Sequence, residues 1–397
     1  MKGRERLLKT LKGGRADRIP VTLFIQSQGH FASQLDEKYD PWDFERTQKS
    51  IIDYQRSLGL DVHARMLFLN PREPVLAVFQ GLNCQTETGS WRVTEEKEWK
   101  GSSCLYRQTI RTPEGELHQT FTVNEIRRGT FQYACTDAPI RTVRDLELAE
   151  KYEPSYPEET REKIRKNVQV IREYVGEDGI VSAWSSGSLF NNLSTLMDQT
   201  ELYALFLTDW EFYDRLMKFA KKRVYSYTDI LLDAGVDAVC LSGNAAGGFL
   251  GNPAFERFVL PYEKELIAYC QRKGNPVIYH NCGRVMELLP SYLKMGAANI
   301  EPFSPAPLGN VDLKRLREMM KGEFSVTSGV DQVHILQEGT REQVAAAVKA
   351  AMEQGRKFPA FIMQNVDFLE YGTPLENVKT YADTALGLSG QYSMEKR

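Results

Sequence analysis

The chain has 397 residues, of which 42% are hydrophobic and 26% are charged, a balance typical of a globular protein. Its 50 basic and 53 acidic residues leave a formal net charge of −3, which argues against the broad positive surface of a nucleic-acid-binding protein. The sequence has no run of about 18 apolar residues and no apolar signal segment at its charged start, so we expect a cytoplasmic protein that does not span a membrane.

The predicted elements alternate between strand and helix along most of the chain. A short strand over 19–24 precedes a helix that begins with Asp40 as N-cap and Pro41 at the first helical position and ends at Leu58. The other predicted strands are 61–68, 180–186, 237–243, 276–282, 297–303, 324–331 and 360–367, with helices predicted over 254–273, 285–295, 311–320 and 341–354. Eight strands alternating with helices predict an α/β fold, a (β/α)8 TIM barrel over residues 1–397 as a single domain.

Residues 70–124 interrupt this alternation. Three segments, 91–94, 104–111 and 117–123, have the pattern of antiparallel strands, and the turn TPEGE joins the last two. We interpret 70–124 as a β-rich insertion between the second and third barrel strands. Because it extends a βα loop, it is expected to form a lid or a substrate wall over the barrel mouth. The alternative is a solvated decoration that only stabilises the fold.

Polar residues stand where the predicted strands end. In a TIM barrel the C-terminal ends of all strands meet at one mouth, so these side chains are expected to converge there. They are Gln26, Gln28, His63, Arg65, Trp184, Ser185, Ser186, Cys240, Asn244, His280, Cys282, Glu301, Asp331, Asn365 and Asp367.

His280 and Cys282 carry the sharpest chemical pattern. Residues i and i+2 of a strand point to the same side, so the imidazole and the thiol are expected to face one another, as two zinc ligands would. Alternatively, both are buried residues without a ligand role. The candidates for the third ligand are Glu301, Asp367 and Cys240, of which Cys240 has the apolar surroundings of a core thiol.

Four further residues are candidates for contacts with a substrate. Trp184 and Phe303 could pack on a planar ring, although aromatic residues beside core strands more often belong to the core. Asn244 and Asn365 are candidates for orienting polar substituents. Asp331 and Asp367 are candidate catalytic acids, with helix capping as the alternative role.

Several stretches resemble signatures of one family, the uroporphyrinogen decarboxylase superfamily. The opening MKGRERLLKTLKGGRADRIPV resembles its start, and FVLPYEKELIAYCQRKGNPVIYHNCGRVMELLPSYLKMGA resembles its P-[YF]…G-x-P-[VI]-x-x-H-x-C-G signature. SGVDQVHILQEGTREQVAAAV and TPLENVKTYADTA are similar to its later segments. The likeness spans nearly the whole chain.

The resemblance implies the corrinoid-dependent methyltransferase branch, of the O-demethylase methyltransferase I type. The porphyrinogen decarboxylases of the superfamily hold substrate carboxylates with two arginines in R-Q-A-G-R-Y-x-P-E-Y, and the matching stretch FIQSQGHFASQL has neither. The methyltransferases bind zinc with H-x-C and a later cysteine. His280 and Cys282 match the first two ligands, and Asp367 stands at the usual cysteine position.

On this resemblance we expect transfer of a methyl group from a small donor, best an aromatic O-methyl ether, to the cobalamin of a separate corrinoid protein, with zinc as Lewis acid. The sequence has no D-x-H-x-x-G cobalamin-binding motif, which places the cobalamin on the partner. A homodimer is compatible with the sequence. Three alternatives stay open: a decarboxylase or lyase on a different substrate, a methylcorrinoid:thiol methyltransferase, and a non-catalytic binding barrel.

Overall fold

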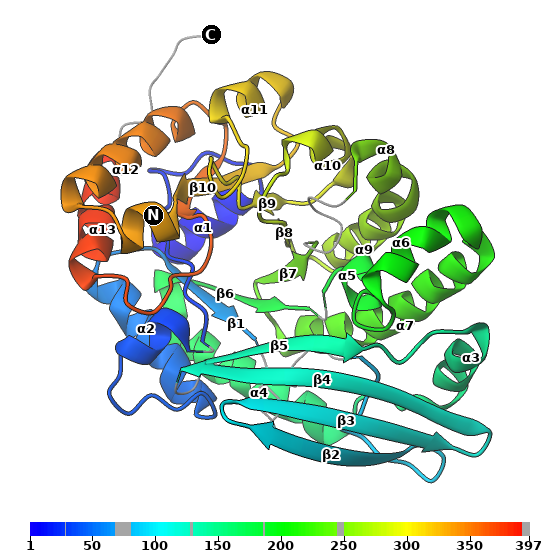
Figure 1. Ribbon diagram of the computed structural model, residues 1–397. Coiled ribbons are helices and arrows are strands. Elements are labelled where there is room, and N and C mark those ends of the chain that lie inside the picture. Colours follow the sequence, from blue (N-terminus) through cyan, green and yellow to red (C-terminus); the bar gives the residue numbers. More distant parts are fainter. Residues whose placement is uncertain (28, 68–80, 128–129, 186, 244–249, 391–397) are drawn as a thin grey trace.

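The computed structural model describes residues 1–27, 29–67, 81–127, 130–185, 187–243 and 250–390 (Figure 1). Three residues of the expected mouth, Gln28, Ser186 and Asn244, lie outside the described residues, as do residues 70–80 of the expected insertion.

A curled parallel sheet of seven strands forms the centre of the molecule (Figure 1). Helices cover the outer face of the sheet and the inner face lines the barrel, so the strands are rich in apolar residues, but several also carry buried polar residues such as Arg65 and Glu301. Every strand position is buried. In spatial order the strands are β1 (Val62–Met66), β6 (Gly179–Trp184), β7 (Ala238–Ser242), β8 (Val277–His280), β9 (Asn299–Glu301), β10 (Ser325–Val330) and β11 (Phe361–Asn365).

The expected first strand, 19–24, is not a regular strand. It makes one isolated parallel bridge, Val21 to Met363 in β11, and the backbone N–H of Asp61 donates to the Val21 carbonyl at 3.0 Å. The Met363 N–H donates to the Pro20 carbonyl and the Thr22 N–H donates to the Met363 carbonyl, both at 2.9 Å, but the Phe24 backbone is hydrogen-bonded to the Asn365 side chain instead of continuing the ladder. The segment therefore lies between the two edge strands, β11 and β1, without completing the eight-stranded sheet that the sequence predicted.

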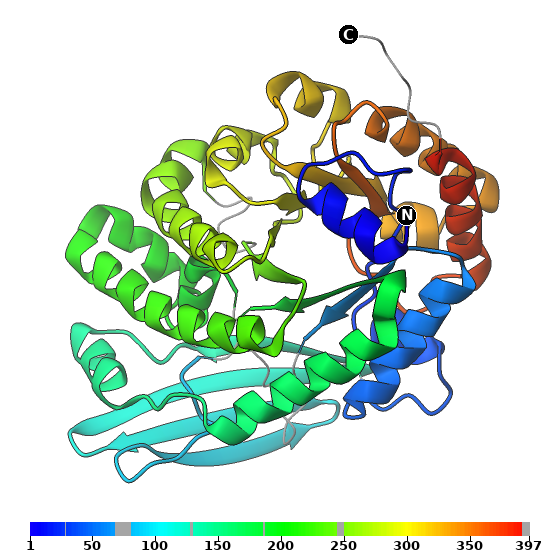
Figure 2. The same cartoon turned by 180° about the vertical axis from the view of Figure 1, so that it is seen from behind.

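Helices surround the sheet and alternate with its strands (Figures 1 and 2). Asp43, rather than Asp40, caps α2, since its side chain accepts from the Arg46 N–H. The helix expected over 254–273 is interrupted near its start by a π-helical turn, Phe255–Val259. The covering helices include α2 (Phe44–Ser57), α4 (Glu158–Val175), α7 (Trp210–Ala234), α9 (Leu260–Arg272), α10 (Leu289–Met295), α11 (Leu313–Met319), α12 (Arg341–Gly355) and α13 (Leu375–Ser389).

Helix α1 (Gly3–Leu11) packs against the inside of the barrel. Its Leu7 and Leu11 share an apolar cluster with strand residues that point inward, including Ile180 and Ile278, and the cluster extends to Phe24 and Trp184. Among the described residues, the barrel interior next to α1 is therefore a packed core, and in a TIM barrel the opposite, C-terminal end of the strands is where side chains typically meet a ligand.

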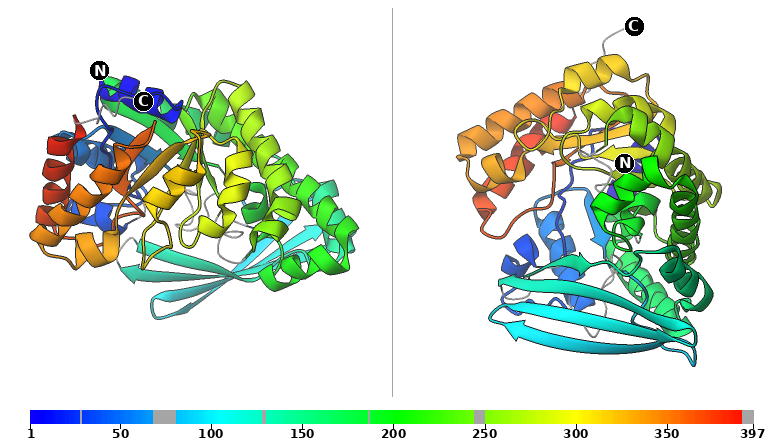
Figure 3. Two further views of the ribbon diagram at one scale, coloured as in Figure 1. Left: turned by 90° about the horizontal axis from the view of Figure 1, so that it is seen from above. Right: turned by 45° about the vertical axis from the view of Figure 1, so that its right-hand side comes forward.

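A four-stranded antiparallel sheet stands in the sequence between β1 and β6. Its strands are β2 (Arg92–Lys100), β3 (Ser103–Thr112), β4 (Gly115–Arg127) and β5 (Thr130–Asp137), in that spatial order. It lies on the side of the barrel away from α1 (Figure 3). The strands extend beyond the expected boundary at 124 and end at Asp137. Buried Ile110 and Leu117 join the main core, whereas β2 is largely exposed.

Among the described helices, none combines the length and apolar character that a membrane crossing requires.

Candidate metal centre at the barrel mouth

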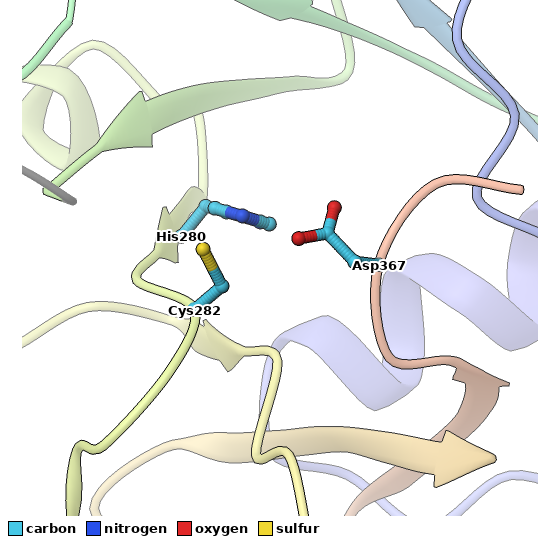
Figure 4. Close-up of side chains that lie close together, drawn as sticks. All are labelled: His280, Cys282 and Asp367. Carbon is cyan, nitrogen blue, oxygen red and sulfur yellow. The ribbon is translucent and has the colours of Figure 1, made fainter. Parts of the chain in front are cut away.

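His280, Cys282 and Asp367 come together at the C-terminal end of the barrel (Figure 4). His280 is the last residue of β8, Cys282 follows two positions later, and Asp367 lies two positions beyond the end of β11. One ligand atom from each residue lies within 4.8 Å of the others. Gly283, with φ of 92°, turns the chain away after Cys282, a conformation that favours glycine.

The donor set fits a zinc ion. An imidazole nitrogen, a thiolate sulfur and a carboxylate oxygen are all common zinc ligands, and three protein ligands with an open position are typical of catalytic zinc sites. His280 is buried, while Cys282 and Asp367 are partly exposed, so the cluster opens toward the mouth.

The ionisation of His280 reflects its anionic neighbours. Burial acts to lower the pKa of His280, but hydrogen bonds to Cys282 and Glu301 outweigh it and raise that pKa to about 10. The pKa of Asp367 is raised by burial, against the opposing effect of His280. A metal ion binding here would displace the imidazole proton, because a ligating histidine must be neutral.

Glu301 does not join this cluster, because Arg65 holds it. Glu301 is the last residue of β9. Arg65 in β1 donates hydrogen bonds to both of its carboxylate oxygens, with Nη2 donating to Oε2 at 2.7 Å. Burial acts to raise the pKa of Glu301, but the guanidinium outweighs it and holds that pKa well below its ordinary value. Glu301 is therefore ionised, and its Oε1 lies 3.3 Å from His280 Nδ1.

Two aromatic rings line the site next to His280. The Trp184 ring meets the His280 ring edge-on with centroids 5.3 Å apart, and Phe24 meets it in the same way at 5.7 Å. Trp184 and Phe24 stack on each other at 6.2 Å. These rings form an apolar wall beside the proposed ligands.

The structure places the other predicted residues in supporting positions. Asp331 caps the turn Gln332–Gln337, where its Oδ1 accepts from two backbone N–H groups at 2.8 and 2.9 Å. The Asn365 amide exchanges hydrogen bonds with the Phe24 backbone at 2.8 and 3.0 Å. Phe303 is 1% exposed and stacks on Phe324. Burial raises the pKa of the Cys240 thiol to about 12, as expected of a core thiol.

Arg65 and Phe24 have roles that the sequence analysis did not identify. Arg65 was visible as a charged residue inside a buried strand, which normally signals a paired charge. Its partner, Glu301, is 236 residues away, and no local pattern connects the two. Phe24 belongs to the segment that was expected to be a regular strand.

The chain is similar to several known proteins. A family model described as uroporphyrinogen decarboxylase (URO-D) matches residues 127–387. A methylated-thiol–coenzyme M methyltransferase of Methanosarcina mazei is 27% identical over 138 residues, which are 35% of this chain and 34% of that protein. The methylcobamide:CoM methyltransferase MtbA of Methanosarcina acetivorans is 23% identical over 195 residues, 49% of this chain and 52% of that protein.

One solved structure covers nearly the whole fold. A methyltransferase from Methanosarcina mazei superimposes with a TM-score of 0.69 at 16% identity, over 98% of this chain and 99% of that chain. This likeness supports the fold alone. The chain spans about half or less of the length of the curated relatives that it matches.

Proposed function

The chain belongs to the uroporphyrinogen decarboxylase family, and from this premise we propose that it is a methyltransferase that acts with a separate corrinoid protein. In this proposal it moves a methyl group from a small methylated donor, best an aromatic O-methyl ether, to the cobalamin of that partner. The names of the two curated relatives support methyl transfer, since both are methyltransferases and one acts on a methylcobamide.

The observation that carries the proposal is the cluster of His280, Cys282 and Asp367. We propose that these three residues bind zinc, and that Asp367 rather than Glu301 is the third ligand. Glu301 has both oxygens engaged by Arg65, whereas the Asp367 carboxylate faces the imidazole (Figure 4). Zinc bound there would act as a Lewis acid on the oxygen of the donor.

The ligand types favour an ether donor. A thiolate transfers more charge to zinc than a carboxylate does, so a site with one of each leaves the metal more electrophilic than a site with two thiolates. A more electrophilic metal is better suited to polarise the oxygen of an aryl ether, from which a phenolate must depart. The Trp184 ring, which meets His280 edge-on and is 7% exposed, is proposed to pack on the aromatic ring of the donor.

The antiparallel sheet is proposed as a wall of the same site. Thr130 at the start of β5 accepts a hydrogen bond from the backbone N–H of His30 at 3.1 Å. The His30 ring lies 4.5 Å from the ring of Phe368, which is the neighbour of Asp367 in the chain. The sheet is thereby connected to the segment that carries a proposed ligand.

A methyl-transfer assay tests the proposal. The protein is incubated with a corrinoid protein reduced to cob(I)alamin and with methyl ethers, thiols or amines, and formation of methylcobalamin is followed by its absorbance. We expect aromatic ethers to methylate the corrinoid protein. This activity should be lost in His280→Ala and after removal of zinc. Activity on a carboxylated substrate without corrinoid protein or zinc would instead identify a decarboxylase or lyase.

The names of the relatives favour a second candidate, transfer of a methyl group from methylcorrinoid to a thiol. The same assay run in reverse separates the two. Demethylation of the methylated corrinoid protein by a thiol, with no reaction from ethers, would favour the second candidate.

A further inference from the structure

We infer that Arg65 is a positioning residue of the proposed metal centre. It holds Glu301 beside His280, where the carboxylate orients the imidazole. The same contact prevents Glu301 from binding the metal itself. This inference rests on the proposed zinc site. It concerns three residues that the barrel brings together from three strands, β1, β9 and β8.

The Arg65–Glu301 contact has the geometry of a fixed pair. Two guanidinium nitrogens donate to the two oxygens of one carboxylate, an arrangement that fixes the orientation of both groups. The side chains are 2% and 1% exposed, so water does not compete for these contacts. Releasing Glu301 toward the metal would leave a buried guanidinium unpaired, which is strongly unfavourable.

Other contacts hold Arg65 itself in place. Its Nη2 also donates to Gln364 Oε1 at 3.0 Å, and the same oxygen accepts from the Thr22 hydroxyl at 3.1 Å. The guanidinium carbon lies 4.4 Å from the centroid of the Phe24 ring. The arginine is thus fixed by β11, by the segment before β1, and by the ring that borders His280.

The Arg65–Glu301 contact affects the proposed metal site through the imidazole of His280. An ionised carboxylate can only accept a hydrogen bond, so in the neutral imidazole that would bind the metal the Glu301 contact favours the proton on Nδ1. That leaves Nε2 as the nitrogen for the metal. Carboxylates behind a ligating histidine set its tautomer and ring orientation, and their loss typically weakens metal binding by about 10- to 100-fold.

Metal affinity and the spectrum of the cobalt-substituted protein test this role. Zinc affinity is measured by competition with a chromophoric chelator, and the Co²⁺ spectrum reports the number and type of ligands. Arg65→Met and Glu301→Gln are expected to weaken zinc binding about 10- to 100-fold. Arg65→Lys retains the charge but not the two-pronged contact, so its affinity should fall between wild type and Arg65→Met.

Two comparisons separate positioning from direct ligation and from a structural role. Asp367→Asn should alter the Co²⁺ spectrum more than Glu301→Gln does, since only Asp367 is taken as a ligand. Arg223→Met removes another partly buried ion pair, with Glu153 at 3.0 Å, and should leave affinity and spectrum unchanged. If Arg65→Met does not fold, the double variant Arg65→Met/Glu301→Gln removes both charges and should show the same loss of affinity.

The outcomes are distinct. Folded Arg65 and Glu301 variants that bind zinc as tightly as wild type, with unchanged cobalt spectra, would overturn the inference. The inference would also be overturned if the Co²⁺ spectrum of Glu301→Gln showed the loss of a ligand while the Co²⁺ spectrum of Asp367→Asn matched that of the wild type. An unaltered protein that binds neither zinc nor cobalt would overturn the proposed metal centre, and this inference with it.

Discussion

Asp367 and His280 face each other from the ends of two strands, β11 and β8, that are separated in the sheet by β9 and β10. Neighbouring strands lie about 4.8 Å apart, so in a flat sheet these strand ends would be about 14 Å apart. Their ligand atoms lie within 4.8 Å only because the sheet is curled. The site is therefore a product of the barrel and not of any local segment.

The first prediction concerns the three proposed ligands. His280→Ala, Cys282→Ala and Asp367→Ala should each reduce bound zinc from about one ion per chain to a small fraction, because a site with two protein ligands binds weakly. Elemental analysis of the purified proteins measures this. Cys240→Ala, at a buried thiol outside the cluster, is the control and should retain zinc. Loss of zinc in that control alone would contradict the assignment.

The fold was largely predictable from the sequence because it depends on repeated patterns. Alternating apolar strands and amphipathic helices indicate a parallel barrel. Six of the seven strands of the parallel sheet lie within the predicted ranges, and β6 begins one residue before its range, at Gly179. The segment 19–24 differed because the Asn365 side chain, and not a backbone ladder, takes hydrogen bonds of the Phe24 backbone at the end of a segment that otherwise has the composition of a strand.

The site was predictable only in part. His280 and Cys282 are two residues apart and lie together as expected, although β8 ends at His280 and Cys282 follows the strand instead of belonging to it. The choice between Glu301 and Asp367 depends on Arg65, whose contact with Glu301 spans 236 residues and is not encoded in either neighbourhood. The sequence also does not distinguish a core position for Phe303 from a position at the barrel mouth. The fold of the backbone decides this, because it stacks Phe303 on Phe324.

A second prediction compares Trp184 with Phe303. Trp184→Leu should raise the KM for an aromatic donor by about 2- to 10-fold, the equivalent of losing a ring contact of about 0.5–1.5 kcal/mol. Phe303→Ala should leave that KM near the wild-type value but lower the free energy of unfolding by about 3–5 kcal/mol, because it opens a cavity in the core. Steady-state kinetics and urea unfolding measure the two effects. A larger KM change in Phe303→Ala would favour the original assignment of Phe303.

A third prediction assigns Asp331 to capping. Asp331→Ala removes the acceptor for the backbone N–H groups of Val333 and His334, and should lower the free energy of unfolding by about 1 kcal/mol. Methyl transfer should be retained. Asp331→Asn keeps a capping oxygen and should recover most of the stability. If Asp331→Asn were stable but inactive, the carboxylate would have a catalytic role after all.

The fourth prediction concerns Glu263 in α9, a buried acid away from the metal cluster. Its carboxylate accepts from the backbone N–H groups of Leu189 and Phe190, at the start of α5 (Leu189–Leu193). Burial raises the pKa of Glu263 to about 7, although these hydrogen bonds and one from Ser188 act in the opposite direction. In the unfolded chain the same group titrates near its ordinary value, about 4.3.

Between these two pKa values the folded protein binds more protons at Glu263 than the unfolded chain does. The free energy of unfolding should therefore decrease as the pH rises from about 4.3 to about 7, and this contribution should level off above that range. Glu263→Gln cannot ionise, so its melting temperature relative to wild type should increase across the same range. Glu265→Gln, on the exposed side of the same helix, is the matched control and should show no such trend. A difference between Glu263→Gln and wild type that stays constant with pH would show that Glu263 is already ionised in the folded protein, held by the N–H groups of α5.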